Sequence, residues 1–407
     1  MSGFRCRACG GTRVPLILPL GRTPLANSLV SPDVARTAEP TYPLELVFCE
    51  DCTLVQINET VPPEHMFSDY AYFSSFSDTM LAHARTLVER VVGERGLGPE
   101  HLAAEIASND GYLLQYYREV GVPVLGIEPA ANIAKVAEAK GIRTVVEFFG
   151  EALAQRLRAD GVRADVIHAN NVLAHVPDLP GFCRGLAALL NDGGRAIIEV
   201  PYVKDLIDHR EFDTIYHEHL SYFSVTALDR LFAAQGLSLV DVERIPIHGG
   251  SLRITAAPQG TPPSEDVSAF LEEEDGLGLT KLPFYARFAR AVEDLRTQLT
   301  GLLQHLRAGG HRIAAYGAAA KGSTLLNYFG IDCRTIEFVA DRSPYKQGKL
   351  MPGVGIPIVP PQFLLATRPD YVLLLTWNFA DEILAQQAEF RAQGGRFIIP
   401  VPDVRVV

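Results

Sequence analysis

Short apolar runs alternate with amphipathic helical stretches between about residue 70 and residue 255. Four runs have the length and composition of buried strands, namely His101–Ile106, Val122–Ile127, Asp165–Ala169 and Arg195–Val200. Strands that alternate with helical patterns form βαβ units, in which the strands pair in parallel and helices cover the sheet. The middle of the chain therefore predicts a parallel α/β sheet.

The same alternation returns near the C-terminus. A long helical pattern runs through Phe284–Arg290 to Leu306, and we expect it to form a connecting helix. The strands expected after it are Arg312–Tyr316, Thr335–Ala340, Tyr371–Thr376 and Arg396–Pro400. They predict a second, smaller Rossmann-like sheet.

Residues 1 to about 65 differ from both regions, because they are rich in Pro, Gly and short apolar runs and have little helical periodicity. A chain of 407 residues is also too long for a single core. We therefore expect an α/β protein of three domains. They are an N-terminal module at 1–68, a central Rossmann-like domain at 69–262, and a linker helix with a smaller α/β domain at 263–407.

Composition restricts the function. Hydrophobic residues make up 47% of the chain, which supports globular folding, and the formal net charge of −11 disfavours nucleic acid as the main partner. No N-terminal run resembles a signal peptide, and no apolar segment reaches the roughly 18 residues of a membrane span. We expect a cytoplasmic, monomeric protein without a membrane or nucleic-acid partner.

Four cysteines form the strongest local motif. Cys6 and Cys9, then Cys49 and Cys52, make two C-x-x-C pairs, and a two-residue spacer lets a tight knuckle aim both thiolates at one ion. The 39 residues between the pairs exceed the ordinary spacing of about 15 to 20, so two disulfides or four unrelated thiols are the alternatives. Four protein ligands leave zinc no open position, so we expect a structural ion and chemistry elsewhere.

A polar loop between the first expected strand and the following helix is the candidate cofactor site. Its residues are Glu105, Ser108, Asn109, Asp110 and Gly111. The loop lacks the full G-x-G-x-x-G of dinucleotide sites. Glu128, followed by Pro129, ends the next strand, where a carboxylate can bind both ribose hydroxyls of an adenosine.

S-adenosylmethionine, which has no phosphates, suits this loop. Its amino-acid end needs carbonyls and small polar groups, and its adenine needs an apolar slot, which Phe148 and Phe149 would form. Asn170 and Asn171 complete the candidate cofactor residues. The alternative is that Glu128 only caps the next helix and that both phenylalanines belong to the core.

The densest polar cluster lies within Phe212–Ser224 and contains Tyr216, His217, Glu218 and His219. A histidine can act as a base at neutral pH, a carboxylate can orient it, and a tyrosine can stabilise an oxyanion. His175 also follows a strand, so we expect it to face the same crevice. A structural His217 and a His-x-His metal site are the alternatives.

Two further segments are candidates for substrate binding. Tyr70, Tyr72 and Ser75 lie between the cysteine module and the central sheet, where the tyrosines would close over a substrate or form a packing seam. In the C-terminal sheet a glycine loop opens a helix, and helix amides with a lysine can hold phosphate. The residues concerned are Lys321, Gly322 and Ser323. A plain left-handed turn is the alternative for this loop.

Together these segments resemble the deoxysugar C-methyltransferases of antibiotic biosynthesis, and in particular dTDP-sugar C-3 methyltransferases of the tetronitrose type. That family has an N-terminal zinc module, a methyltransferase domain with Asn-Asn-Val-Leu-Ala-His and Tyr-His-Glu-His segments, and a C-terminal domain with Gly-Ala-Ala-Ala-Lys-Gly. This sequence contains all of them. The resemblance covers nearly the whole chain and implies a central class I methyltransferase sheet.

The resemblance also implies roles. His219 would be the catalytic base and Glu218 its support, Tyr216 and His175 would lie near the sugar, and Tyr70 would belong to a lid. The implied substrate is a dTDP-linked 4-keto-6-deoxy sugar, either 2,6-dideoxy or not, which would be methylated on C-3 while the Lys321 loop holds the diphosphate. Methylation on C-5 and a non-catalytic zinc- and nucleotide-binding protein are the alternatives.

Overall fold

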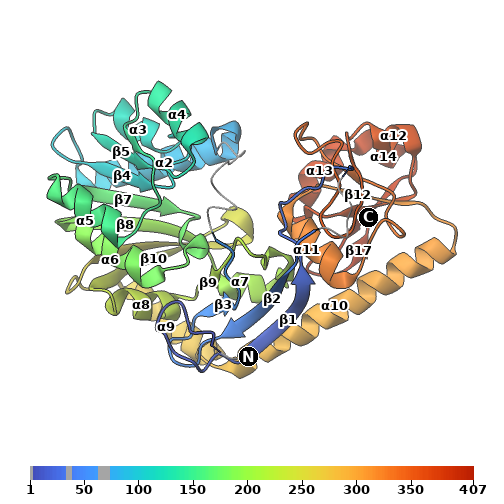
Figure 1. The fold of residues 1–407 in the computed structure, drawn as a ribbon, viewed down its shortest axis with the longest axis horizontal. Helices are drawn as coiled ribbons and strands as arrows, with labels where there is room; N and C mark the ends of the chain where they lie inside the picture. Colours follow the sequence, from blue (N-terminus) through green and yellow to red (C-terminus); the bar gives the residue numbers. More distant parts are fainter. Residues whose placement is uncertain (1–2, 34–38, 63–73) are drawn as a thin grey trace.

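The structure, a computed structural model, describes residues 3–33, 39–62 and 74–407. These residues form three sheets. Figure 1 shows a central lobe and a C-terminal lobe joined by the long helix α10 (Leu282–Ala308), with the first strands of the chain lying between the lobes at the base of the molecule. The two lobes are the two α/β regions expected from the sequence.

The N-terminal sheet is antiparallel and has the order β1-β2-β3-β9. Its strands are β1 (Leu16–Thr23), β2 (Tyr42–Phe48), β3 (Val55–Ile57) and β9 (Ser221–Tyr222). The last of these comes from the polar cluster of the central region, and it pairs Tyr222 with Val55 and Ser221 with Gln56. The cysteine module is therefore completed by a strand far away in sequence.

The central sheet has the order β10-β11-β8-β7-β4-β5-β6. Its strands are β4 (Ala103–Ile106), β5 (Val124–Ile127), β6 (Thr144–Val145), β7 (Ala164–Asn170), β8 (Leu190–Pro201), β10 (Leu237–Ile245) and β11 (Ser251–Pro258). We expected a parallel sheet, which is wrong for β11, since it runs antiparallel to both β8 and β10. The connection from β10 to β11 is the short segment around the 3-10 helix η5 (Ile247–Gly249), and so short a connection joins antiparallel strands.

Helices cover both faces of the central sheet. They are α2 (Asp78–Arg95), α3 (Leu114–Glu119), α4 (Ala131–Ala139), α5 (Glu151–Ala159), α6 (Leu179–Leu189), α8 (Val225–Ala233) and α9 (Glu265–Leu277). Helix α7 (Val203–Asp208) instead shares the hydrophobic core of the N-terminal sheet. Short 3-10 helices occupy the connections, namely η2 (Ser74–Phe76), η3 (Leu173–His175) and η4 (Phe212–Thr214). Of these, η3 ends at the candidate residue His175, and η4 forms the start of the polar cluster.

The C-terminal sheet has the order β14-β13-β12-β15-β16-β17, parallel except for β17. Its strands are β12 (Ile313–Tyr316), β13 (Val339–Ala340), β14 (Ile358–Val359), β15 (Tyr371–Leu374), β16 (Arg396–Ile399) and β17 (Arg405–Val406). The helices are α11 (Ala320–Phe329), α12 (Phe363–Thr367), η6 (Trp377–Phe379), α13 (Ala380–Gln386) and α14 (Ala388–Ala392). This is the expected smaller Rossmann-like sheet.

Helix α10 joins the N-terminal sheet to the C-terminal lobe through one hydrophobic core. Its buried residues Val292, Leu295 and Leu299 recur every three to four positions, so they line one face of the helix. They share a core with Phe48 of β2 and Leu373 of β15. Burial of each such side chain contributes about 1.5–3 kcal/mol to the stability of the fold. This face of α10 therefore holds both the N-terminal sheet and the C-terminal lobe against the helix.

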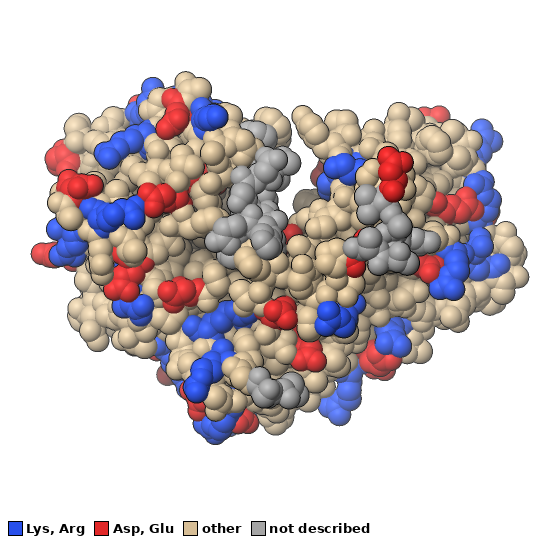
Figure 2. Space-filling model, in the orientation of Figure 1, with Lys and Arg blue, Asp and Glu red and all other residues tan. Residues whose placement is uncertain are grey.

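Charges on the face shown in Figure 2 are mixed, since lysine and arginine are interspersed with aspartate and glutamate. The same view shows a hollow between the two lobes. Within the described ranges every helix is too short or too polar to cross a bilayer.

Candidate active site

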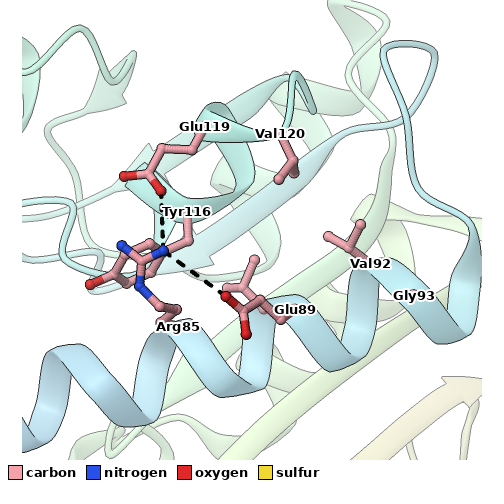
Figure 3. Close-up of a pocket in the computed structure, with 8 residues that line it drawn as sticks. Arg85, Glu89, Val92, Gly93, Tyr116, Glu119 and Val120 are labelled. Carbon is pink, nitrogen blue, oxygen red and sulfur yellow. Dashed lines mark ion pairs between the residues drawn. The ribbon is translucent and has the colours of Figure 1, made fainter.

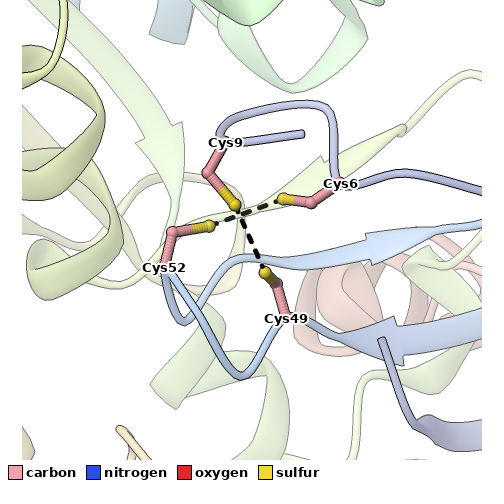
Figure 4. A group of neighbouring side chains, drawn as sticks. All are labelled: Cys6, Cys9, Cys49 and Cys52. Atoms are coloured by element: carbon pink, nitrogen blue, oxygen red, sulfur yellow. Dashed lines mark hydrogen bonds between the residues drawn. The ribbon is translucent and has the colours of Figure 1, made fainter. Parts of the chain in front are cut away.

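The four cysteine side chains converge on one point (Figure 4). Cys6 Sγ lies 3.5 Å from Cys52 Sγ, Cys9 Sγ lies 3.6 Å from Cys49 Sγ, and all four sulfur atoms lie within 4.8 Å of one another. Tetrahedral zinc with bonds of about 2.3 Å requires sulfur atoms about 3.8 Å apart. The donor set fits zinc, whereas the two disulfides of the alternative would need sulfur pairs about 2.05 Å apart.

The surroundings of the thiolates support a structural ion. Gln56 Nε2 donates to Cys6 Sγ at 3.0 Å, and the Gly11 amide donates to Cys9 Sγ at 3.4 Å. Because Gln56 belongs to β3 and Cys49 directly follows β2, the ion ties the N-terminal knuckle to the sheet. Four thiolates complete the coordination of zinc, so the ion stabilises the fold and has no position for a substrate.

The candidate cofactor loop turns sharply after β4. Ala107 and Asn109 have φ angles of 52° and 48°, which are left-handed and cost non-glycine residues about 1–2 kcal/mol each. The backbone N–H of Asn109 donates to Glu128 Oε2 at 2.9 Å. The side-chain Oδ1 of Asn109 accepts a hydrogen bond from the backbone N–H of Ser74, also at 2.9 Å. Gly111 serves packing, because a β-carbon there would lie 2.2 Å from Ile142 Cδ1.

Unsatisfied acceptors gather on the residues of this site. Four buried oxygen atoms lack a hydrogen-bond partner among the described residues: Glu105 Oε2, Ser108 Oγ, Asp110 Oδ1 and Asn170 Oδ1. Burial, together with the neighbouring carboxylates Glu128 and Asp110, raises the pKa of Glu105 well above its usual value. A ligand that brings positive charge and hydroxyl donors would satisfy this set, and S-adenosylmethionine brings an ammonium, a sulfonium and two ribose hydroxyls.

Glu128 directly follows β5, as expected for a residue that binds ribose. Its Oε1 also accepts the Ala130 amide at 2.8 Å, just before α4, so it caps that helix as the alternative stated. Each carboxylate oxygen keeps a second lone pair, so capping leaves room for a ribose hydroxyl. Burial raises the pKa of Glu128, and the amides of Ala130 and Asn109 oppose that rise. Pro129 continues the chain towards α4.

The two phenylalanines have different environments. Phe149 packs edge to face on Phe182, with ring centroids 5.2 Å apart, so it belongs to the core as the alternative stated. Phe148 is 44% exposed, so its ring is open to solvent. Asn171 follows β7 with a φ of 57°, and its amide donates to the Glu199 carbonyl at 2.8 Å. The roles of these residues in cofactor binding stay predictions.

His219 and Tyr216 lie side by side after η4. The Tyr216 hydroxyl lies 3.1 Å from His219 Nε2, and His219 Nδ1 lies 2.9 Å from the Thr214 carbonyl oxygen. A carbonyl only accepts, so Nδ1 carries the proton in neutral His219 and Nε2 is the basic nitrogen. The His175 ring meets the His219 ring edge to face at 4.9 Å. Three of the candidate residues are therefore brought together.

His217 and His175 are held by backbone carbonyls. His217 is 1% exposed, and its Nε2 donates to the Pro43 carbonyl of β2 at 3.0 Å. Burial lowers the pKa of His217, which matches the structural role of the alternative. His175 Nδ1 donates to the Glu218 carbonyl at 2.6 Å, and burial lowers the pKa of His175 as well. Burial therefore favours the neutral form of both histidines.

The Glu218 side chain meets a residue that the sequence did not point to. Asn27 Nδ2, from the segment after β1, donates to Glu218 Oε1 at 2.7 Å. Burial raises the pKa of Glu218, and the bond from Asn27 opposes that rise. The two residues are 191 positions apart, so no local motif indicated the contact.

Lys321 lies in the first turn of α11 and faces the central lobe. Its Nζ is 3.9 Å from Glu211 Oε2 and 4.6 Å from the centroid of the Trp377 ring. Burial raises the pKa of Glu211 to about 7, against the influence of Lys321. Gly322 serves packing, because a β-carbon there would lie 2.7 Å from Leu375 Cβ.

Ser323 and Ser75 lie in different surroundings from those expected. Ser323 is 2% exposed and its hydroxyl donates to the Ala26 carbonyl at 2.8 Å, so it holds α11 to the N-terminal segment. The Ser75 hydroxyl donates to Asp110 in the cofactor loop. Tyr70 and Tyr72 lie outside the described residues. Substrate binding by these four residues stays a prediction.

Two surface hollows lie along α2. One, of about 240 Å³, lies between α2 and α3, where Arg85 makes ion pairs with Glu89 and Glu119 and stacks on Tyr116 (Figure 3). The other, of about 250 Å³, is lined by His83, Arg253 and their neighbours. Neither includes a residue of the polar cluster or of the cofactor loop.

Three family models match the chain in succession. Residues 6–67 match "Putative zinc binding domain", residues 82–242 match "Methyltransferase domain", and residues 246–402 match "C-methyltransferase C-terminal domain". The matches fall on the cysteine module, the central lobe and the C-terminal lobe respectively.

Individual proteins are similar as well. C-methyltransferase NovU of Streptomyces niveus is 37% identical over 404 residues, which is 99% of this chain and 96% of NovU. Ubiquinone biosynthesis O-methyltransferase of Methylobacterium sp. is 31% identical over 29% of this chain and 50% of its own length. The crystal structure of magnesium protoporphyrin IX methyltransferase from Synechocystis with bound S-adenosylmethionine covers 48% of this chain and 89% of its own, at 15% identity and a TM-score of 0.35.

Proposed function

Because the chain belongs to the family of S-adenosylmethionine-dependent C-methyltransferases, we propose that it methylates C-3 of a dTDP-linked 4-keto-6-deoxy sugar. Membership of this family sets aside the alternative of a non-catalytic binding protein. The ketone at C-4 makes the neighbouring C–H acidic, so a base in the site can create the carbon nucleophile that C-methylation requires.

The observation that carries the proposal is the hydrogen bonding of His219. With its Nδ1 proton held by the Thr214 carbonyl, the basic Nε2 is directed to the side where Tyr216 lies. A base and an oxyanion partner 3.1 Å apart match the two atoms of an enolising ketone, since a proton leaves carbon while charge grows on the adjacent oxygen. His217 has no such position, because its Nε2 is bonded to β2.

The proposed reaction begins when His219 Nε2 removes the C-3 proton. The C–H electron pair becomes the enolate, and the Tyr216 hydroxyl, which donates to His219 Nε2 before substrate binds, turns to donate a hydrogen bond to the oxygen at C-4. When bound, S-adenosylmethionine would supply the methyl group, whose bond to sulfur would break as the bond to C-3 forms, with S-adenosylhomocysteine as the leaving group. His175 keeps the His219 ring in place through their edge-to-face contact, and Glu218 supports this pair, since its carbonyl accepts from His175 Nδ1.

Three parts of the chain divide the work in this proposal. The module at 1–68 carries the structural zinc, the region at 69–262 binds the methyl donor, and the region at 263–407 binds the sugar nucleotide. Lys321 would meet the diphosphate, because its ammonium lies in the first turn of α11, where helix amides also favour an anion. The partner is a small molecule, and the mixed charges seen in Figure 2 do not form a nucleic-acid stripe on that face.

Incubation with methyl-labelled S-adenosylmethionine and a dTDP-4-keto-2,6-dideoxy sugar tests the proposal. NMR of the product should show a new methyl group on C-3, and a substrate deuterated at C-3 should lose its label. Loss of deuterium from C-5 instead would move the reaction to that carbon. If neither position is methylated in 2,6-dideoxy and 6-deoxy substrates, the sugar substrate is wrong.

A further inference from the structure

The 3-10 helix η4 (Phe212–Thr214) lies directly before the proposed base. Its last carbonyl, that of Thr214, accepts from His219 Nδ1 at 2.9 Å and from the Tyr222 hydroxyl at 3.4 Å. This oxygen keeps the proton on Nδ1 and so leaves Nε2 basic. The contacts that hold η4 in place therefore also decide which nitrogen of His219 can accept a proton.

The C-terminal lobe holds η4 at two points. Trp377 Nε1 in η6 donates to Asp213 Oδ2 at 2.7 Å, and Asp213 is fully buried. Next to it, Phe212 stacks on Phe329 of α11 with ring centroids 4.8 Å apart. The position of Thr214 relative to His219 is thus set partly by a different lobe of the protein.

Trp377 also contacts the residue proposed to bind the diphosphate. The ammonium of Lys321 lies 4.6 Å from the centroid of the indole ring, within the range of a cation–π contact. Because η6 follows β15 and α11 follows β12, both side chains come from the carboxyl ends of neighbouring parallel strands. In a doubly wound sheet this is the edge where ligands bind.

We propose that Trp377 and Asp213 are positioning residues for His219, which hold η4 so that the Thr214 carbonyl orients the base. The inference rests on the proposed role of His219. It adds a function for the C-terminal lobe, because one side chain of that lobe, Trp377, would both contact the nucleotide-binding Lys321 and support the catalytic base.

Four variants test this role. Trp377→Phe keeps an aromatic ring under Lys321 and removes the N–H donor, and Asp213→Leu removes the acceptor. Asp213→Asn restores an oxygen that can accept from the indole. Asp403→Leu is the matched control, because it removes the acceptor of another contact between the lobes, which Arg210 makes with Asp403 at 2.7 Å from outside η4.

Steady-state methyl transfer separates positioning from binding. Trp377→Phe and Asp213→Leu should lower kcat by about 10- to 100-fold, the range expected when a reacting group is displaced by about an ångström, with KM for the sugar nucleotide nearly unchanged. Asp213→Asn should recover most of the rate, and Asp403→Leu should retain it. A raised KM at constant kcat, or equal rates in Asp213→Leu and Asp213→Asn, would overturn the proposal.

A second measurement does not depend on the substrate. In protein labelled with ¹⁵N-histidine, the His219 signals, assigned with His219→Gln, should report protonation at Nδ1 in the wild type and a mixture of tautomers in Trp377→Phe. An unchanged tautomer in a folded Trp377→Phe protein refutes the positioning role, whatever the activity. If the wild type methylates no sugar, the proposed function fails, and the tautomer measurement alone decides this inference.

Discussion

His168 gives a pH dependence that can be worked out from the structure. It lies in β7, is fully buried, and its Nε2 lies 2.8 Å from the Tyr117 hydroxyl. Burial lowers the pKa of His168 from 6.5 to about 4. The folded protein therefore keeps this histidine neutral at a pH where the unfolded chain protonates it.

The sign of the effect follows from proton linkage. The contribution of neutral His168 to the free energy of unfolding is complete above pH 6.5, where the histidine is neutral in both the folded and the unfolded state. This contribution is lost as the pH falls towards 4. At 1.36 kcal/mol per pH unit the whole effect is about 3.4 kcal/mol, and at pH 5 it reaches about 2 kcal/mol. His168→Gln removes the titrating group and keeps a side chain that can pair with Tyr117.

Urea unfolding followed by circular dichroism at pH 7.5 and pH 5 tests this. The difference in free energy of unfolding between His168→Gln and the wild type should shift by about 2 kcal/mol in favour of the variant at pH 5. His305→Gln makes the same substitution at an exposed site on α10 and should show no such shift. A difference that is constant with pH would refute the reasoning.

Three further predictions follow from other sites. His219→Gln should lower kcat by roughly 10²- to 10⁴-fold while calorimetry shows unchanged S-adenosylmethionine binding, and a wild-type rate would remove His219 as the base. Glu274→Gln should cost about 2 kcal/mol in chemical unfolding, because buried Glu274 accepts the amides of Val225 and Thr226 at 2.7 and 2.8 Å, whereas the exposed neighbour Glu273→Gln should change little. Cys49→Ser should lower both the zinc content, measured by atomic absorption, and the thermal midpoint, and a fully metallated, equally stable variant would contradict a four-cysteine site.

The sequence was most informative where chemistry depends on short spacing. The C-x-x-C pairs predicted the metal ligands, and the residues after β4 and β5 predicted an acidic, polar site at the carboxyl ends of the strands. Periodicity also predicted the strands of both Rossmann-like sheets. It missed the two-residue strands β6, β14 and β17, and it missed β10 and β11, whose alternating polar positions suit a half-exposed hairpin at the end of a sheet.

What the sequence left open depends on contacts between distant segments. His217 and His219 are two positions apart and chemically identical, and only the Pro43 carbonyl, 174 positions from His217, makes one of them structural. The pairing of Asn27 with Glu218 and of Trp377 with Asp213 likewise joins residues more than 160 positions apart. No local pattern encodes such a contact, because each partner is an ordinary polar or aromatic residue in its own segment.

The strand β9 limits how this protein can be recombined with its relatives. Ser221 and Tyr222 complete the sheet that carries the zinc knuckles, and they follow His219 by only two and three residues. A chimera that exchanges the cysteine module alone would pair a foreign β3 with a native β9 right next to the proposed base. Grafts that transfer residues 212–223 together with the module keep this joint intact, so they are the exchanges expected to yield active hybrid enzymes.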